Sequence, residues 1–324
     1  METLKIGVIG TGHMGRNHVR NLSEDRRFDL IGIYDTDTGQ AKEVSEKFGV
    51  EAFGSFDALL ENVDAVVIAA PSSNHMELAL EAADHNCHAL VEKPLATIGS
   101  DARVIVEEFE KKGLKLAVGH IERFNPVFKE LKKLTKPDDI FFIETCRYSP
   151  FSSSGRIKDT TVVEDLMIHD VDLVCALMGD HKLTSIHGRG ESVVTANTDF
   201  ATCLMDFGGR SHAVVNVSRI SQNKERSITV HASDCCIHAD LLAKTLEVYK
   251  STNLTIDLEK ENSYKQDGIV QKIYVPIEEP LRMELIAFYD HVVNNKPIEV
   301  DGEAGIRAIE ICEEVSNRAK RKDN

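Results

Sequence analysis

The sequence predicts an α/β fold: a doubly wound parallel sheet, followed by a second, α+β domain with a large, open and mostly antiparallel sheet. Three observations support this prediction. Strand and helix patterns alternate over the first 120 residues, strand patterns then follow one another at short spacing, and 324 residues exceed the usual size of a single core. We place the first domain at residues 1–122 and the second at residues 123–302.

The first domain is predicted from short apolar runs that alternate with amphipathic stretches. Repeated strand–helix units of this length form a parallel sheet with helices on both faces, and right-handed crossovers produce the doubly wound order. Ligands of such sheets bind at the carboxyl ends of the strands. The predicted strands are 4–9, 29–34, 64–70, 87–91 and 115–119, and the predicted helices are about 13–22, 38–48, 74–85 and 100–112.

Short turns separate the strand patterns of the second domain. Gly208-Gly209 stands between two apolar runs as a two-residue hairpin turn, and such connections imply antiparallel pairing. The domain's own helices can cover one face of the sheet, so we expect the other face to join subunits in a homodimer or homotetramer. The predicted strands are 140–148, 183–189, 199–207, 211–219, 226–232, 236–241, 244–250 and 270–276; the helices are 126–135, 161–178, 280–294 and 303–319.

Composition disfavours several classes of protein. Lys and Arg number 38 against 53 Asp and Glu, and the resulting charge of −15 argues against nucleic-acid binding. No apolar run approaches the roughly 20 residues that span a bilayer, and a strand that begins by Lys5 leaves no room for a signal peptide. Seven scattered cysteines indicate reduced thiols in a cytoplasmic protein. No HxxxH, CxxC or HExxH spacing occurs, so we predict no metal site.

A glycine-rich turn follows the first predicted strand directly, and an acidic residue ends the second. In GxGxxG the first glycine permits a tight turn, the second lets the backbone approach a pyrophosphate, and the third allows close helix–strand packing. Asp35 stands 20 residues after the last glycine, where a carboxylate can bind both ribose hydroxyls and would repel a 2′-phosphate. The pattern predicts a Rossmann domain that binds NAD rather than NADP; the alternative is a glycine-rich turn in an unrelated α/β domain. The turn consists of Gly10, Thr11, Gly12, His13, Met14 and Gly15.

A lysine follows the strand predicted at 87–91, within the segment Glu92-Lys93-Pro94. At the carboxyl end of a strand, above the cofactor crevice, Lys93 is placed to touch a substrate hydroxyl and to shuttle its proton. The alternative is a surface lysine in a turn.

The helix predicted at 161–178 carries a carboxylate and a histidine on one face. Asp165 and His169 are spaced i and i+4, and Asp172 lies near the same side. Hydride transfer from an alcohol requires loss of the hydroxyl proton, which a histidine oriented by a carboxylate can accept. The alternative is an Asp–His pair on a helix surface.

Together these motifs resemble the glucose–fructose oxidoreductase / inositol dehydrogenase / MocA family of NAD(P)-dependent sugar dehydrogenases, over essentially the whole chain. The resemblance implies that Lys93, Asp165 and His169 form the catalytic group, and that the last helix, about 303–320, packs back on the first domain. We favour His169 as the direct base, with Lys93 completing the hydrogen bonds to the substrate. The motifs are the glycine turn, Ala69-Ala70-Pro71 with His75, Glu92-Lys93-Pro94, Gly119–Pro126 and Asp165–Asp172. NAD is expected to contact Ala70, Pro71, His75, Glu92 and Lys93 besides the turn and Asp35.

Within the family, two segments resemble dehydrogenases of nucleotide-activated amino sugars, the UDP-N-acetylglucosamine 3-dehydrogenase type. They are Gly119–Pro126 and the cation-bearing loop Arg147–Asp159, whose arginine forks suit a diphosphate. The loop departs from the subgroup at 152–155, where Ser-Ser-Ser-Gly replaces a more proline-rich stretch, and the alternative for its arginines is solvated surface charge. The expected substrate-binding residues are Lys93, Arg123, Asn125, Arg147, Arg156, Asp165 and His169.

The resemblance implies oxidation of a secondary alcohol of a sugar to a ketone, at C3 of a UDP-N-acetylamino sugar in the favoured interpretation. An inositol or free-sugar dehydrogenase is the nearest alternative. A catalytically silent protein that senses NAD or sugar belongs to a different class, but it would be expected to lose the lysine or the histidine, and both are present. A structural or nucleic-acid-binding scaffold is disfavoured by the charge of −15.

Overall fold

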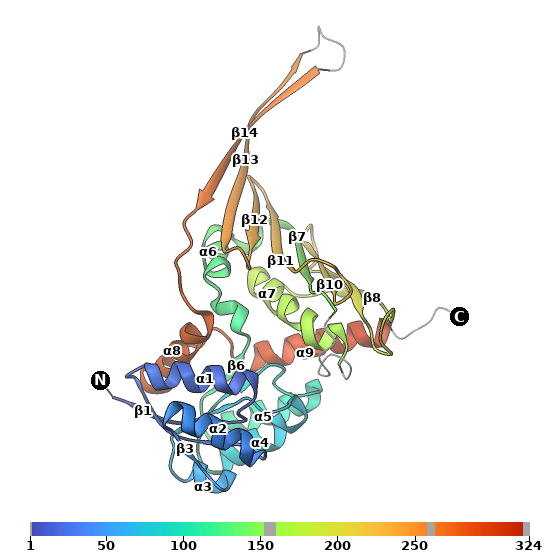
Figure 1. The fold of residues 1–324 in the computed structure, drawn as a ribbon. Coiled ribbons are helices and arrows are strands. Elements are labelled where there is room, and N and C mark those ends of the chain that lie inside the picture. Colours follow the sequence, from blue (N-terminus) through green and yellow to red (C-terminus); the bar gives the residue numbers. More distant parts are fainter. Residues whose placement is uncertain (1, 152–159, 258–262, 320–324) are drawn as a thin grey trace. The chain divides into compact units, whose positions relative to one another are not determined.

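The computed structural model describes residues 2–151, 160–257 and 263–319, and it divides into two units. The first comprises Met1–Phe124 and Glu278–Glu310, and the second comprises Asn125–Ile277 and Ile311–Asn324 (Figure 1). The predicted second domain, 123–302, included the helix at 280–294; the structure instead assigns Glu278–Glu310 to the first unit.

Six parallel strands form the sheet of the first unit, in the order β3-β2-β1-β4-β5-β6. This is the predicted doubly wound arrangement. The segments β3 and α3 were not predicted, because two and five residues are too short to show a hydrophobic period. The strands are β1 Leu4–Ile9, β2 Phe28–Tyr34, β3 Glu51–Ala52, β4 Ala65–Ile68, β5 His88–Glu92 and β6 Leu116–Gly119; the helices are α1 His13–Glu24, α2 Thr38–Phe48, α3 Phe56–Leu60, α4 His75–Asp84 and α5 Gly99–Lys111, with 3₁₀ turns η1 Ser72–Asn74 and η2 Ile121–Phe124.

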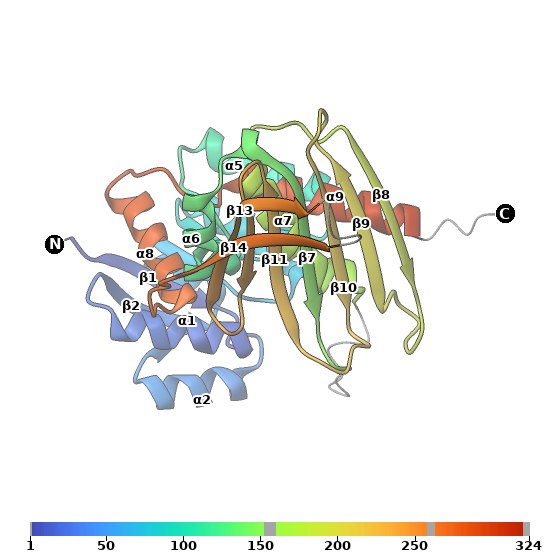
Figure 2. The same cartoon turned by 90° about the horizontal axis from the view of Figure 1, so that it is seen from above.

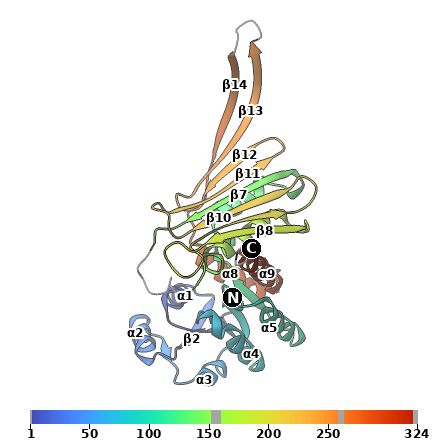
Figure 3. The same cartoon turned by 90° about the vertical axis from the view of Figure 1, so that its right-hand side faces the viewer.

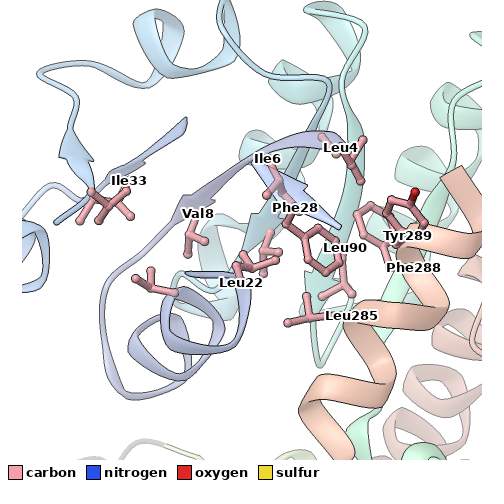
Figure 4. Close-up of a cluster of buried hydrophobic side chains, with 14 of the residues drawn as sticks. Leu4, Ile6, Val8, Leu22, Phe28, Ile33, Leu90, Leu285, Phe288 and Tyr289 are labelled. Atoms are coloured by element: carbon pink, nitrogen blue, oxygen red, sulfur yellow. The ribbon is translucent and has the colours of Figure 1, made fainter. Parts of the chain in front are cut away.

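A late helix, α8 Pro280–Val293, completes the core of the first unit (Figure 4). Leu285 and Phe288 are buried among the strand residues, and the ring of Tyr289 meets that of Phe28 edge-to-face at 5.8 Å between centroids. The apolar face of α8 thus explains why it belongs to this unit. Periodicity reveals such a face but does not say which sheet will cover it.

The last helix, α9 Gly302–Ala319, contributes to both units. A Cβ on Gly302 would lie 2.4 Å from the Val106 side chain in the first unit. In the second unit, a Cβ on Gly188 would lie 2.9 Å from the side chain of Val315. Close packing at both ends needs the absence of a side chain at these glycines.

Eight strands form the sheet of the second unit, in the order β14-β13-β12-β11-β7-β10-β9-β8 (Figure 2). The β7–β10 pair is parallel and the other neighbours are antiparallel, which confirms the predicted sheet type. Gly208 and Gly209 have φ values of +78° and +61°, as a two-residue hairpin turn requires. The strands are β7 Ile140–Tyr148, β8 Ser185–Glu191, β9 Phe200–Asp206, β10 His212–Ser218, β11 Glu225–Ala232, β12 Cys236–Asp240, β13 Thr245–Asp257 and β14 Ser263–Ile273.

The β13–β14 hairpin is longer than the predicted strands at 244–250 and 270–276, and in Figure 3 it continues past the ends of its neighbours. Helix α6 Pro126–Leu134 lies against β12 and β13, and α7 Ile168–Met178 lies against β7 and β10. Short 3₁₀ and π segments, η3 Pro137–Asp139 and η5 Val163–Met167, precede β7 and α7. Among the described residues, none of the helices is long and apolar enough to cross a bilayer.

Candidate functional site

The turn between β1 and α1 has the geometry that a pyrophosphate needs. Gly10 has a φ of +86°, and a Cβ on Gly15 would lie 1.8 Å from the Gly10 carbonyl oxygen. A Cβ on Gly12 would meet nothing within 4 Å, so the backbone stays open to a ligand there. Gly12 is also the N-cap of α1, and no described side chain caps this helix end or places an acid in its first turn. The helix N-terminus therefore suits an anion.

Asp35 lies at the edge of the same turn. Its Oδ2 accepts hydrogen bonds from the Thr11 N–H at 2.6 Å and the Thr11 hydroxyl at 2.8 Å, and its Oδ1 accepts one from the Asp37 N–H at 2.8 Å. Gln40 Nε2 also donates to Oδ2, at 3.4 Å. A carboxylate has about four acceptor positions, and Oδ1 accepts only one of these hydrogen bonds, so half-buried Asp35 can still use Oδ1 to bind a ribose hydroxyl. The turn and Asp35 together fit NAD. Thr11 is fully buried and serves to orient Asp35.

His75 ties two strand-end loops together. Its Nδ1 lies 2.7 Å from the Pro94 carbonyl oxygen and its Nε2 lies 2.9 Å from that of Ala70. Burial lowers the pKa of His75, although both carbonyls oppose this shift. His75 is 1% exposed and holds Ala70 and Pro94 through these contacts, and its predicted contact with NAD stays a prediction.

Glu92 and Lys93 lie at the carboxyl end of β5, two strands from the glycine turn. Glu92 is buried, and its Oε1 lies 2.8 Å from Nε2 of His18 on α1. Its Oε2 accepts a hydrogen bond from the Lys93 N–H at 3.3 Å. Lys93 is half-buried, and the Lys93–Pro94 peptide bond is cis. Lys93 thus follows directly a residue that is held on two sides.

Asp165 and His169 lie at the start of the predicted helix, and the first turn there is a π-helix rather than an α-helix. Thr161 and Glu164 form a capping box, with Thr161 N–H to Glu164 Oε2 at 3.1 Å and Glu164 N–H to Thr161 Oγ1 at 3.3 Å. Both Asp165 and His169 are half-buried. Single π turns occur frequently at functional sites. Lys93 belongs to the first unit and these two residues to the second.

Two of the predicted substrate-binding residues have structural roles. Arg147 is 2% exposed, and its Nε and Nη2 donate to the two carboxylate oxygens of Asp170 at 3.0 and 2.9 Å. The Asn125 Oδ1 accepts from the Val127 N–H at 3.1 Å as the N-cap of α6, and its Nδ2 donates to the Leu241 carbonyl at 3.4 Å. These polar atoms are already hydrogen-bonded inside the protein, and substrate binding by Arg147 and Asn125 stays a prediction.

The two other predicted arginines are Arg123 and Arg156. Arg123 is 8% exposed, and its Nη1 donates to the Glu299 carbonyl at 3.4 Å within the first unit. Arg156 lies outside the described residues.

A cavity of about 230 Å³ lies on the second unit's sheet, among side chains of β7, β9 and β10. Side chains alternate along β7, so buried Arg147 and half-buried Tyr148 point to opposite faces. Tyr148 lines the cavity, which therefore lies on the face opposite to α7. This cavity is on the open face where we expect subunits to meet, and it is not a site for Asp165 and His169. It is lined by Tyr148, Phe200, Ala201, Thr202, Asn216, Val217, Ser218 and Ser221.

Two titratable residues near Glu92 were not predicted, namely His18 and Glu284. An oxygen of Glu284, an oxygen of Glu92 and a ring nitrogen of His18 all lie within 4.8 Å of one another, and all three residues are buried. The sequence did carry a signal for Glu284. In the helix predicted at 280–294 it falls with Leu281, Leu285 and Phe288 on one apolar face, where an acid is unexpected.

Known protein families match segments of both units. Residues 4–120 match the family described as "Oxidoreductase family, NAD-binding Rossmann fold", and residues 143–238 match the GFO/IDH/MocA C-terminal domain. UDP-N-acetylglucosamine 3-dehydrogenase of Acidithiobacillus ferrooxidans is 30% identical over 315 residues, which cover 95% of each chain. A solved structure of that name and organism has a TM-score of 0.88 at 28% identity and covers 99% of each chain.

A second relative acts on a different substrate by name. Myo-inositol 2-dehydrogenase of Thermotoga maritima is 27% identical over 321 residues, which cover 94% of this chain and 93% of that one. The two family matches fall in the first and the second unit, respectively. The chain therefore belongs to the GFO/IDH/MocA family of oxidoreductases, and its first unit is an NAD-binding Rossmann domain.

Proposed function

We propose that the protein is an NAD-dependent dehydrogenase that oxidises a secondary alcohol of a sugar to a ketone, at C3 of a UDP-N-acetylamino sugar. The observation that carries the proposal is the position of Lys93. It follows Glu92 at the carboxyl end of β5, in the same parallel sheet whose β1 leads into the glycine turn. Ligands of such sheets bind at this edge. The similarity to a UDP-N-acetylglucosamine 3-dehydrogenase over 95% of the chain supports the choice of substrate.

Two side chains act on the hydroxyl group that is oxidised in the proposed reaction. When bound, NAD supplies the hydride acceptor. The C–H bond of the secondary alcohol breaks with its electron pair, and the O–H proton goes to His169, while Lys93 holds the oxygen by a hydrogen bond. Asp165 orients His169 from the preceding helical turn. The products are then a ketone, NADH and one proton, so atoms and electrons balance.

The nucleotide part of the substrate needs cations. Arg147 is committed to Asp170, which leaves the loop cations Arg156 and Lys158 as the proposed partners of a diphosphate. Because these two residues lie outside the described ranges, their role is proposed from the sequence alone.

A substrate panel tests the activity. Purified protein, NAD and a set of UDP-sugars, inositols and free sugars are mixed, and NADH absorbance is followed. We expect turnover with a UDP-N-acetylamino sugar and a product oxidised at C3. Arg156→Ala should then raise KM for the UDP-sugar about tenfold or more, since one charged hydrogen bond contributes about 1.5–3 kcal/mol, and leave any free-sugar activity unchanged. Turnover of myo-inositol alone would replace this proposal by the nearest alternative, and the Thermotoga maritima relative keeps that alternative open.

The Asp35 carboxylate is expected to set the choice of cofactor. Asp35→Ser and Asp35→Asn both remove the negative charge, so each should lower the ratio of kcat/KM with NAD to kcat/KM with NADP by at least about tenfold. Asn keeps a carbonyl oxygen for the Thr11 N–H, whereas Ser does not, and the pair separates charge from turn geometry. The measurement is kcat/KM with each cofactor. A wild-type preference for NADP would contradict the ribose argument.

We also propose that the protein is a cytoplasmic homodimer or homotetramer joined through the open face of the eight-stranded sheet. In the part of the chain that the structure describes, no cysteine forms a disulfide, which suits a reducing compartment. On the open face, Leu204 and Tyr249 are 37% and 41% exposed, and Phe142 stacks between His212 and His231. Apolar groups on a sheet face favour a partner surface. Light scattering that reports a monomer would argue against it.

A further inference from the structure

Glu284 is a buried acid in the interior of the first unit. It lies on the apolar face of α8 with 2% exposure, and neither carboxylate oxygen has a hydrogen-bond partner among the described residues. An ionised carboxylate in such a place has lost its water and gained nothing in return. The environment therefore favours the neutral acid.

The neighbours of Glu284 reinforce this conclusion. Glu92 has two partners of its own, the His18 imidazole at 2.8 Å and the Lys93 N–H at 3.3 Å. Its negative charge faces Glu284 across less than 4.8 Å. Burial first, and then the charge of Glu92, raise the pKa of Glu284 well above its ordinary value of 4.5.

Other charged groups near α8 have partners elsewhere. On α1, Arg20 pairs with Glu279, the N-cap of α8. On η2, the segment packed against α8, Arg123 donates to the Glu299 carbonyl, and Glu122 is a second buried charge. Of these groups, Glu92 is the one whose charge acts on Glu284.

One imidazole and two carboxylates could also hold a divalent metal. The direct contact between His18 Nε2 and Glu92 Oε1 argues for a proton instead. That hydrogen bond needs a proton on Nε2 or on the carboxyl group, and in either case Nε2 has no lone pair left for an ion.

We propose that Glu284 remains protonated in the folded protein and donates a hydrogen bond to Glu92, and that it thereby acts as a positioning residue for Lys93. The Glu92 carboxylate is then held from three sides, by His18, by Glu284 and by the N–H of the residue that it precedes. These contacts keep the Glu92 carboxylate in one orientation while Lys93, the next residue in the chain, acts on the substrate. The part of the inference that concerns turnover rests on the proposed function, whereas the proton on Glu284 does not.

The stability of the full chain tests whether Glu284 is protonated in the folded protein. The folded-state pKa of Glu284 is raised, so above its ordinary pKa the folded form holds one proton more than the unfolded form, and stability is lost as pH rises toward the folded pKa. Glu284→Gln keeps a neutral donor and does not titrate. Between about pH 5 and 8, the folding constant of Glu284→Gln relative to wild type should rise by up to about tenfold per pH unit. Urea unfolding at each pH measures this ratio.

A matched control and a metal analysis complete the test. Glu303→Gln removes an exposed acid from α9, and its ratio to wild type should stay constant over the same range. A constant ratio for Glu284→Gln would overturn the proposal. So would metal in about equimolar amount in purified wild type that is lost in Glu284→Gln.

Turnover tests the positioning role separately. Glu284→Gln should keep kcat within about threefold at neutral pH, and Glu284→Leu, which cannot donate to Glu92, should lower kcat about tenfold or more with little change in KM. Equal kcat values for Gln and Leu would overturn the positioning role. If wild type turns over no substrate, the proposed function fails. The pH dependence of stability still decides whether Glu284 is protonated.

Discussion

Lys93→Ala is expected to lower kcat by about 10²-fold or more while NAD binding stays intact, because it removes the hydrogen bond that holds the reacting oxygen, and one such donor contributes about 10²–10³-fold. Lys93 lies at the carboxyl end of β5, apart from Asp35 and the glycine turn that fit the adenosine half of the cofactor. Removing its side chain therefore should not disturb that half. Steady-state kinetics give kcat, and fluorescence titration gives the Kd for NAD.

Two further variants make this result decisive. Lys93→Arg keeps the charge but replaces the compact ammonium group by a larger planar guanidinium, which cannot donate to the oxygen from the same position, so it should recover little turnover. Lys5→Ala removes an exposed lysine near the amino end of β1, at the opposite edge of the sheet, and should leave kcat unchanged. Near-normal turnover in Lys93→Ala would remove the lysine from the catalytic group.

Arg147→Met is expected to lower the free energy of unfolding by about 3–5 kcal/mol, because it leaves a buried carboxylate without its partner. The side chains of Arg147 and Asp170 are each 2% exposed and form a bidentate pair between β7 and α7. Urea unfolding measures the loss. Catalytic parameters of the folded fraction should change little, in contrast to what a substrate-binding arginine would show.

A double-mutant cycle separates the pair from simple packing. Arg147→Met combined with Asp170→Leu replaces both charges by apolar groups, and it should recover much of the lost stability, since buried ion pairs can be replaced with little net cost. Arg189→Met removes an arginine that is 84% exposed and paired with Glu191, and it should change stability little. Stability of Arg147→Met equal to that of wild type would show that the pair is not needed for the fold.

Local patterns in the sequence were sufficient for most of the fold. Alternating strand and helix signals predicted the first sheet, and the Gly208-Gly209 turn predicted one hairpin of the second. Each of these signals depends on residues that are neighbours in the chain. The assignment of α8 to the first unit could not be predicted in this way, because Leu285 and Phe288 pack against strands some 200 residues earlier in the sequence.

The predicted site residues also differ in whether a local motif or a tertiary contact determines their surroundings. Gly12 and Asp35 have the geometry that the motif implied. Arg147 and Asn125 were expected to bind substrate because they stand beside the right motifs, but the fold uses them as an ion-pair partner and a helix cap. The sequence did contain a sign that Arg147 is buried, since it continues the period-two series of Ile143 and Thr145 on the buried face of β7.

The sequence by itself determined the glycine turn, the position of Asp35 at the end of the second strand and the strand-end position of Lys93, because short-range geometry and strand order suffice for them. Only the tertiary structure decided which charges are buried and with what partner. His18, Glu92 and Glu284 come from three distant segments and meet in the interior of the first unit. In that setting the loss of water, and not the residue type, determines whether an acid keeps its proton or pairs with a cation.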